Sequence, residues 1–433
     1  MMKKIILLMI FVCIMNFGGC AFLNNMHYIS ADNILSDVEN EKPEDKVQDP
    51  LEIKISAVGD IMVHGPQLRA QYNQNKEEYN FKNNFQFVKP YISQADIALC
   101  NLETTFGGVN KGYSSFPKFN TPDSLGEAIK DAGFDAVITA NNHTIDSGGK
   151  GVFRTIKELK KLGLDVVGTK ENEACENFIV KKVKNVKFGI IAYTYETPKW
   201  GNHKTLNSLI VPKEVESCIN TFNYANVDED LKKMKKEIQR MREQGVEVII
   251  FYLHWGNEYH REPNKYQKKI AQYLTDVGVD IIFGSHPHVL QPIEFMENEN
   301  RKKKTLVVYS MGNFLSNQRY EILKNRYTED GIILNITLLK DFEKNLITIK
   351  EVAYVPTWVH KYFKNGRKVY EIIPLNDALD NPTIYHLLNK DSLWRAKNSK
   401  NNTTILIESE TNEKIYQTPP ISNAENNKIT GNM

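Results

Sequence analysis

The sequence GSHPHV, residues 284–289, follows directly on the apolar run VDIIF, residues 279–283. The run is short, rich in β-branched residues and bounded by a glycine, which is typical of a buried strand. His286 and His288 therefore lie at a strand end, where alternating imidazoles direct their nitrogens into one small volume. A lone histidine there would most often be a packing residue. A metal site at this position requires carboxylates and further nitrogen ligands from the rest of the chain.

Other predicted strands end in polar side chains of the same kinds, and ligands of α/β sheets gather at the carboxyl ends of strands. Each such residue alone has an ordinary structural explanation, such as a turn position or a packing contact. Their recurrence at equivalent places predicts a centre for one or two divalent ions, and mixed oxygen and imidazole ligands favour Mn, Fe or Zn. In chain order these residues are Asp60 and His64 (AVGDIMVHG), Asn101 and Glu103 (CNLETTFGG), Asn142, His143 and Asp146 (TANNHTIDSGG), His254 and Glu258 (YLHWGNEY), His286 and His288 (GSHPHV), and Asn313 (YSMGNF).

The order of the predicted elements indicates the fold class. Short apolar runs alternate with helical segments over residues 51–284, whereas the runs at residues 304–310, 331–340 and 345–355 follow one another without long helices. The first pattern favours parallel strands with crossover helices, and the second favours antiparallel pairing. The predicted fold is an α/β (α+β) four-layer sandwich, in which two mixed β-sheets pack face to face with helices outside.

Composition and charge narrow the functional classes. The chain has 433 residues, and 41% of them are hydrophobic, so it can form a sizeable core. Its 55 basic residues nearly balance its 53 acidic ones, and no long basic patch is interleaved with aromatic residues. The sequence therefore predicts no nucleic-acid partner.

The N-terminus has the pattern of a targeting segment. MMKK is basic, and the apolar IILLMIFVCIMNF that comes next is too short to span a membrane comfortably. With Gly18 and Gly19 before Cys20, residues 1–20 resemble a bacterial lipoprotein signal peptide, in which the cysteine is acylated. An uncleaved signal anchor is the alternative. The prediction is a protein held by lipid on the extracytoplasmic face of the cell membrane.

The segments on either side of the alternating pattern are polar. Residues 21–50 are acidic and lack a sustained period, which predicts a flexible tether. Residues 361–433 are rich in polar residues towards their end, which predicts a largely disordered tail. These boundaries leave one folded domain at residues 51–360.

The ordered set of motifs resembles that of a known family. GDIMVHG, NLETTFGG, ANNHTIDSGGKG, LHWGNEY, and GSHPHVLQPIE with YSMGNF are similar to the motifs of the bacterial capsule-synthesis CapA family. They also resemble the blocks of the calcineurin-like metallophosphoesterases. The resemblance covers roughly residues 53–360 and implies a metallophosphoesterase-like fold and a role in poly-γ-glutamate synthesis and export.

The resemblance also implies roles for individual residues. Glu103 falls where the phosphoesterases have a bridging aspartate, and His143 falls where they have the acid that protonates the leaving group. The remaining implied ligands are Asp60 and His288 for a first metal, and Asn142, His254 and His286 for a second. His64 is displaced from the position that the phosphoesterase pattern gives to a metal-binding histidine. His64, Asn101 and Glu258 are the remaining candidate site residues.

Two functional hypotheses remain open at this level. The first is a metal-dependent hydrolase that acts outside the membrane on a phosphorylated or γ-glutamyl substrate. The second is an accessory subunit that holds polyglutamate or contacts a membrane-bound synthase without turnover. The retained His143 favours the first hypothesis, and the altered motif around His64 favours the second.

Overall fold

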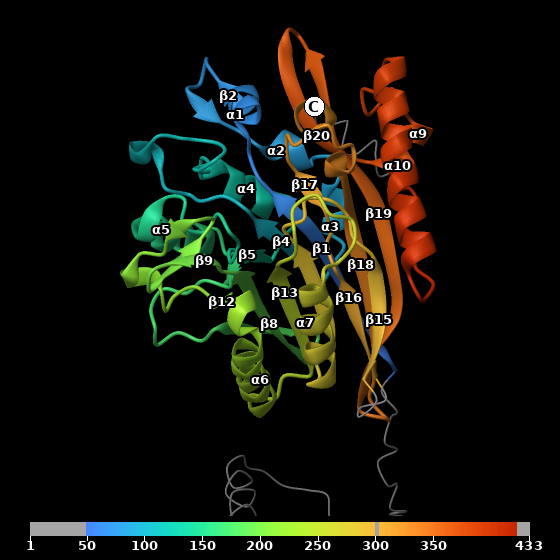
Figure 1. The fold of residues 1–433 in the computed structure, drawn as a ribbon. Coiled ribbons are helices and arrows are strands. Elements are labelled where there is room, and N and C mark those ends of the chain that lie inside the picture. Colours follow the sequence, from blue (N-terminus) through green and yellow to red (C-terminus); the bar gives the residue numbers. More distant parts are fainter. Residues whose placement is uncertain (1–48, 299–302, 422–433) are drawn as a thin grey trace, which may run out of the picture. The chain divides into compact units, whose positions relative to one another are not determined.

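Two mixed β-sheets lie at the centre of the fold, in a computed structural model that describes residues 49–298 and 303–421 (Figure 1). The first sheet has the order β20-β19-β18-β1-β4-β5-β6, with β17 paired to β1 and β21 paired to β19. Its strands β1, β4, β5 and β6 are parallel, whereas β18, β19 and β20 are antiparallel neighbours. The strands are β1 (Leu51–Ile61), β4 (Ile97–Leu102), β5 (Ala136–Ile138), β6 (Asp165–Val167), β17 (Asn313–Leu315), β18 (Asp330–Asp341), β19 (Leu346–Lys364), β20 (Arg367–Pro374) and β21 (Tyr416–Gln417).

The second sheet has the order β12-β8-β13-β14-β16-β15, with β7 paired to β8. Its central strands β8, β13, β14 and β16 are parallel. The strands are β7 (Phe178–Val183), β8 (Val186–Tyr195), β12 (Thr221–Phe222), β13 (Val248–His254), β14 (Ile281–Ser285), β15 (Ile293–Asn298) and β16 (Lys303–Val308). Smaller ribbons are formed by β2 (Tyr72–Asn73) with β3 (Glu78–Tyr79), and by β9 (Thr197–Trp200), β10 (His203–Leu206) and β11 (Leu209–Ile210).

The two sheets pack face to face because their strands are apolar on both sides. In β13 every residue is buried, as expected for a central parallel strand. Ile250 and Tyr252 face the other sheet, whereas Ile249 and Phe251 face the outer helices. The core between the sheets also contains Ile53, Ile55, Leu99, Ile190, Phe283, Leu334 and Tyr354. The Tyr252 hydroxyl donates a hydrogen bond across it to the Val58 carbonyl, at 3.0 Å.

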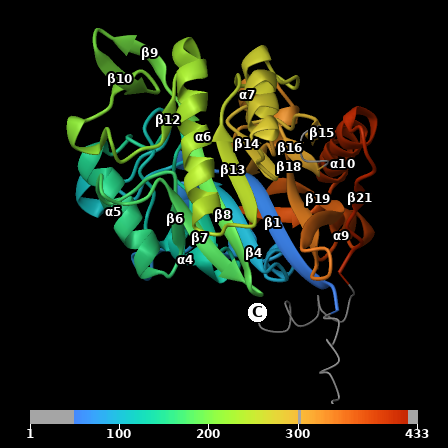
Figure 2. The ribbon, with the colours of Figure 1, turned by 90° about the horizontal axis from the view of Figure 1, so that it is seen from below.

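Helices cover the outer face of each sheet (Figure 2). The first sheet buries its outer side chains against α4 and α5, and the second buries its own against α6 and α7. On α6 the buried stripe recurs at helical spacing through Leu231, Met234, Ile238 and Met241. The α-helices are α1 (Gly65–Gln71), α2 (Lys82–Phe85), α3 (Lys89–Ile92), α4 (Ser124–Asp131), α5 (Gly148–Lys161), α6 (Val227–Glu243), α7 (Lys265–Asp276), α8 (Tyr320–Leu323), α9 (Leu375–Asp380) and α10 (Lys390–Glu410). The predicted four-layer sandwich is confirmed.

The prediction of a largely disordered tail from residue 361 is wrong for residues 361–421. Strand β19 continues to Lys364, and β20, α9, α10 and β21 come after it. Helix α10 lies along β18 and β19 (Figure 1). Its composition is polar, but Leu406 and Ile407 are buried in the core between the sheets, and Arg395 forms ion pairs with Glu321 and Glu329. A few well-placed apolar side chains and these ion pairs fix a segment whose average composition suggests disorder, so the folded domain extends well past residue 360.

The predicted signal peptide at residues 1–20, with Cys20, lies outside the described residues, as does the predicted tether up to residue 48. The end of the tail, residues 422–433, lies outside them as well. Within residues 49–298 and 303–421, no helix combines the length and apolar character needed to cross a membrane.

Candidate metal centre

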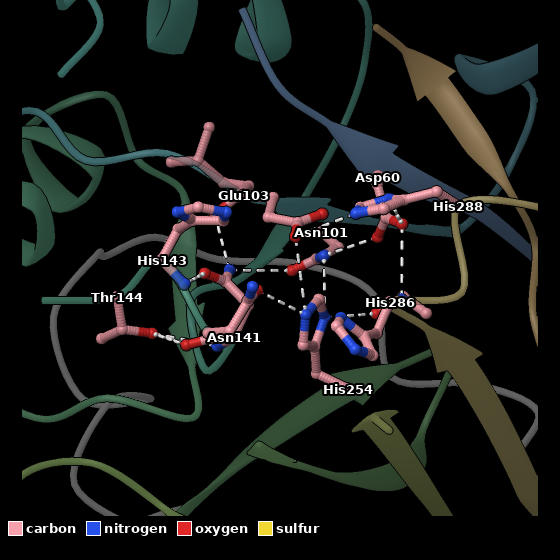
Figure 3. A network of polar contacts seen from close by, with 12 residues as sticks. Asp60, Asn101, Glu103, Asn141, His143, Thr144, His254, His286 and His288 are labelled. Atoms are coloured by element: carbon pink, nitrogen blue, oxygen red, sulfur yellow. Dashed lines mark hydrogen bonds and ion pairs between the residues drawn. The ribbon is translucent and has the colours of Figure 1, made fainter. Parts of the chain in front are cut away.

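The carboxyl ends of parallel strands from both sheets meet at one place (Figure 3). Strands β1 and β4 and the loop after β5 contribute from the first sheet, and β13 and the loop after β14 contribute from the second. The structure thus brings together residues from five separate stretches of sequence. They are Asp60, Asn101, Glu103, Asn142, His143, His254, His286 and His288, all of them buried.

Asp60 is held at the end of β1 by an irregularity in that strand. The pairing of β1 with β4 shifts between Ala57 and Asp60. Gly59 allows the local approach of the chains, because a Cβ atom there would lie 1.9 Å from the Gly312 carbonyl oxygen. The Asn101 amide donates to one Asp60 oxygen at 2.7 Å, and His288 Nδ1 lies 3.1 Å from the other. Asn101 therefore orients Asp60.

Glu103 has an unusual environment for a carboxylate. Its side chain is fully buried, yet neither oxygen has a hydrogen-bond partner in the described part of the chain. Burial raises the pKa of Glu103 well above its ordinary value, and the charge of Asp60 adds to the shift. Its Oε1 atom lies 3.5 Å from His254 Nε2 and 3.7 Å from His288 Nε2. A buried carboxylate in this environment is suited to binding a cation.

Two histidines beside Glu103 favour the neutral form of the imidazole ring. Burial, together with the neighbouring imidazoles, lowers the pKa of His254 and of His286 well below the usual value. His254 Nδ1 lies 2.9 Å from the Ser285 hydroxyl, and its Nε2 lies 2.8 Å from Asn142 Oδ1. His286 Nδ1 is buried and has no hydrogen-bond partner among the described residues. Neutral imidazole is the form that binds metals.

The GSHPHV loop positions its two histidines through a strained backbone. His286 and His288 have φ angles of +96° and +56°, which non-glycine residues adopt rarely. The loop is held in this form by hydrogen bonds from the Asn313 amide to the His288 carbonyl at 3.2 Å, and from the Tyr259 N–H to the Pro287 carbonyl at 2.7 Å. Strain of this kind clusters at functional sites.

These donors form overlapping groups with the spacing needed to hold a metal ion. Within the described residues, one group is Asp60, Glu103 and His288, and a second is Glu103, His254 and His286. A third combines the exposed Glu258 with His286 and His288. Glu103 belongs to the first two groups, so it lies where a bridging ligand would. The unpaired carboxylate oxygens and the unpaired His286 nitrogen fit a divalent cation.

His143 lies beside this cluster and is held by two residues. Its Nδ1 atom is 2.7 Å from Asp146 Oδ2, and Phe119 packs its ring edge-on at a centroid distance of 4.7 Å. The loop that carries it is closed by Thr144, whose hydroxyl accepts from the Asn141 N–H at 2.9 Å and donates to the Thr139 carbonyl at 2.6 Å.

His64 lies outside the candidate metal groups. Its Nδ1 atom accepts a hydrogen bond from the Asn317 N–H at 3.2 Å, and burial lowers its pKa to about 4. The chain enters α1 directly after it, and the His64 ring packs against Phe119 at a centroid distance of 5.3 Å, on the same ring that contacts His143.

Two residues that contact the candidate site, Tyr195 and Phe119, were not predicted as metal ligands or as the proton donor. Tyr195, at the end of β8, packs its ring 4.7 Å from that of His286. Phe119 comes from the loop before α4, and no strand-end pattern marks it. The sequence signal for Tyr195 is its place at the end of the apolar run FGIIAYTY, where a tyrosine is interpreted first as a core residue.

Comparisons with known proteins agree with the motif resemblance. The family model of the bacterial capsule synthesis protein PGA_cap matches residues 54–318. The chain belongs to this family. The capsule biosynthesis protein CapA of Bacillus anthracis is 27% identical over 367 residues, covering 80% of this chain and 76% of that protein. The PGA biosynthesis protein CapA of Bacillus subtilis (strain 168) is 27% identical over 372 residues, covering 83% and 84%.

Among solved structures, a phosphatase from Mycoplasma pneumoniae aligns with 71% of this chain and 93% of its own. The sequence identity is 12% and the TM-score is 0.37.

Proposed function

We propose that this chain is a divalent-metal-dependent hydrolase of capsule-polymer assembly. The observation that carries the proposal is the buried Glu103 carboxylate, which lacks donors and faces the Nε2 atoms of His254 and His288. Burying such a charge is very unfavourable without a compensating cation. A packing role for these histidines would leave the carboxylate unexplained.

In this proposal, two neighbouring metal positions share Glu103. Asp60 and His288 would complete one position, and the second would be completed by Asn142, His254 and His286. When bound, the metal would supply Lewis acidity to a phosphoryl or acyl oxygen and would acidify a water molecule. Mn, Fe and Zn are the ions that such mixed oxygen and nitrogen donors favour.

His143 would protonate the leaving group. Asp146 accepts a hydrogen bond from the Nδ1–H group of His143. The Nε2 atom then points away from Asp146 and is the ring nitrogen that can exchange a proton with the substrate. The edge of Phe119 restricts rotation of the ring. A histidine oriented in this way is a typical general acid.

The substrate class is inferred from the family. The B. subtilis relative is named for PGA biosynthesis, and a γ-glutamyl polymer or a phosphorylated precursor of the capsule is the proposed substrate. The assay is the release of phosphate or glutamate from each of these substrates by metal-replete protein, with His143→Gln as the test variant. The exposed His203 on β10 provides the control, His203→Gln. Equal turnover by both variants would contradict the role of His143.

The proposed location is the extracytoplasmic face of the cell membrane, with the protein anchored by lipid on Cys20. The support is the basic and apolar segment before Gly18, Gly19 and Cys20. Labelling with a radioactive fatty acid tests it, because wild type should be processed and labelled and Cys20→Ser should be neither. Fatty-acid labelling of Cys20→Ser protein would contradict a lipid anchor on Cys20.

A second candidate is a metal-binding accessory subunit of a membrane-bound synthase. The position of His64 favours it, since a histidine that the phosphoesterase pattern places at the metal is here engaged with Asn317. Protein that binds metal, turns over neither substrate and co-purifies with a membrane-bound synthase subunit would support this candidate over the hydrolase.

A further inference from the structure

A groove of about 510 Å³ near the candidate metal centre is lined by several basic side chains. It lies between the loop after β13, the region around α8 and the exposed side of α10. Its lining includes three cations, three tyrosines and three asparagines, and no acidic residue. They are Arg261, Lys324 and Arg326; Tyr259, Tyr320 and Tyr327; and Asn325, Asn398 and Asn402.

The groove adjoins the GSHPHV loop through Tyr259. The Tyr259 ring lies 6.2 Å from that of His288, and its N–H donates to Pro287. Its hydroxyl accepts from the Gln318 amide at 3.4 Å. Tyr259 thus lines the groove and also packs beside a candidate metal ligand.

The two arginines of the groove are held in place but have unused donors. Arg261 lies 4.1 Å over the Tyr327 ring, and Arg326 lies 4.3 Å over Tyr320 and 4.6 Å over Trp394. Within the described chain neither guanidinium forms an ion pair, in contrast to the nearby Arg395, which pairs with Glu321 and Glu329. Stacking on aromatic faces preorganises a guanidinium and leaves its edge N–H groups available for a planar anion.

The exposed Glu258 interacts with the Tyr259 hydroxyl at the end of the groove nearest the candidate metal groups. Two further acids near the groove do not neutralise it. The Glu321 carboxylate is engaged by Arg395. Asp330 is buried behind Asn402, and burial raises its pKa to about 8, so it carries little charge at neutral pH. The local excess of positive charge thus contrasts with the near balance of the whole chain.

We propose that this groove binds the anionic part of the ligand, meaning two or more carboxylate or phosphate groups, while the bond to be cleaved lies at the metal centre. The position of the cleaved bond rests on the proposed hydrolase function, whereas anion binding in the groove does not. Arg261 and Arg326 each bind one anionic group, and Lys324 adds a third cation. A volume of this size accommodates several units of a linear ligand.

The test is calorimetric binding to metal-free full-length protein, with pentaglutamate and inorganic tripolyphosphate as separate probes. Wild type should bind at least one probe with an affinity that falls as salt is added. Each of Arg261→Gln and Arg326→Gln should weaken binding about tenfold, and the double variant about a hundredfold, as expected for lost charge-assisted hydrogen bonds. Arg261→Lys should retain part of the affinity, which distinguishes charge from folding.

The matched control removes two exposed cations elsewhere, Lys235→Gln with Lys236→Gln on α6. Binding of pentaglutamate alone assigns the groove to a polycarboxylate, binding of tripolyphosphate alone assigns it to a phosphate, and binding of both supports an anion site shared by both classes. Failure of wild type to bind either probe, or equal binding by the double variant, overturns the proposal. Because no metal or turnover is involved, loss of the hydrolase proposal would leave this result standing.

Discussion

His143 Nδ1 lies 2.7 Å from Asp146 Oδ2, three residues further along the chain. The same carboxylate oxygen accepts a hydrogen bond from the Phe119 N–H at 2.6 Å, so Asp146 is fixed by a second loop. A carboxylate at this position favours the tautomer with a proton on Nδ1. The pair therefore defines which nitrogen of His143 is available for chemistry.

Asp146→Asn should lower turnover about 10- to 100-fold, the usual effect of losing a partner that orients a functional histidine. His143→Gln should lower it further, by about 10²- to 10⁴-fold, because the proton donor itself is lost. Both variants should keep the metal content of wild type, since neither residue belongs to a candidate metal group. Steady-state kinetics beside elemental analysis checks this, and unchanged turnover in Asp146→Asn would contradict the orienting role.

Helix α10 should be required for stability. A chain that stops after Asn389 loses the buried Leu406 and Ile407, each worth about 1.5–3 kcal/mol of hydrophobic free energy. We expect a much lower melting temperature and rapid proteolysis within β18 and β19. A chain that stops after Ile421 is the control and should melt like wild type. Equal melting of the two truncations would show that α10 adds nothing.

Asp330 should make stability depend on pH in a direction unusual for an aspartate. Burial raises its folded pKa to about 8, whereas an unfolded aspartate has a pKa of about 3.9. Between these values the folded state retains a proton that the unfolded state has released, so this residue lowers the free energy of unfolding as pH rises. The effect is complete above about pH 8.

Asp330→Asn removes this titration. Urea unfolding should show the variant more stable than wild type at pH 9, by about 1–3 kcal/mol on the scale of a buried polar group. At pH 5 the two should differ by less. Parallel pH profiles for the two proteins would contradict the raised pKa.

Metal binding should raise thermal stability, because ligands that bind only the folded state stabilise it by mass action. Protein treated with EDTA should melt lower than protein resupplied with Mn²⁺ or Zn²⁺, and the difference should grow with metal concentration. His286→Ala should reduce the increase, since it removes a nitrogen that has no other partner among the described residues. If metal raised the melting temperature of His286→Ala as much as that of wild type, the metal would not be bound through His286.

The layers and most of the site could be predicted from the sequence because both depend on strand patterns. Apolar runs identify β1, β4, β13 and β14, and parallel strands bring their carboxyl ends to the same edge. The residues directly after those runs, such as Glu103 and His254, are therefore placed by topology alone.

The features that escaped prediction depend on contacts distant in sequence. The order in residues 361–421 depends on burial of a few side chains of α10 against β18 and β19, which composition does not reveal. Phe119 reaches His143 from a loop without periodicity.

Glu103 is proposed to hold a divalent metal together with the surrounding histidines. Glu103→Gln keeps the size of the side chain and removes its charge. Glu371→Gln is the matched control, because Glu371 is also buried but lies on β20 beside Tyr362 and Gln86, outside the candidate centre.

Elemental analysis of wild type and both variants after metal-replete purification is the most direct measurement. We expect bound Mn, Fe or Zn in wild type and in Glu371→Gln, and a large loss of bound metal in Glu103→Gln. Wild-type protein without any of these metals, or Glu103→Gln protein with a full complement, would contradict the proposal.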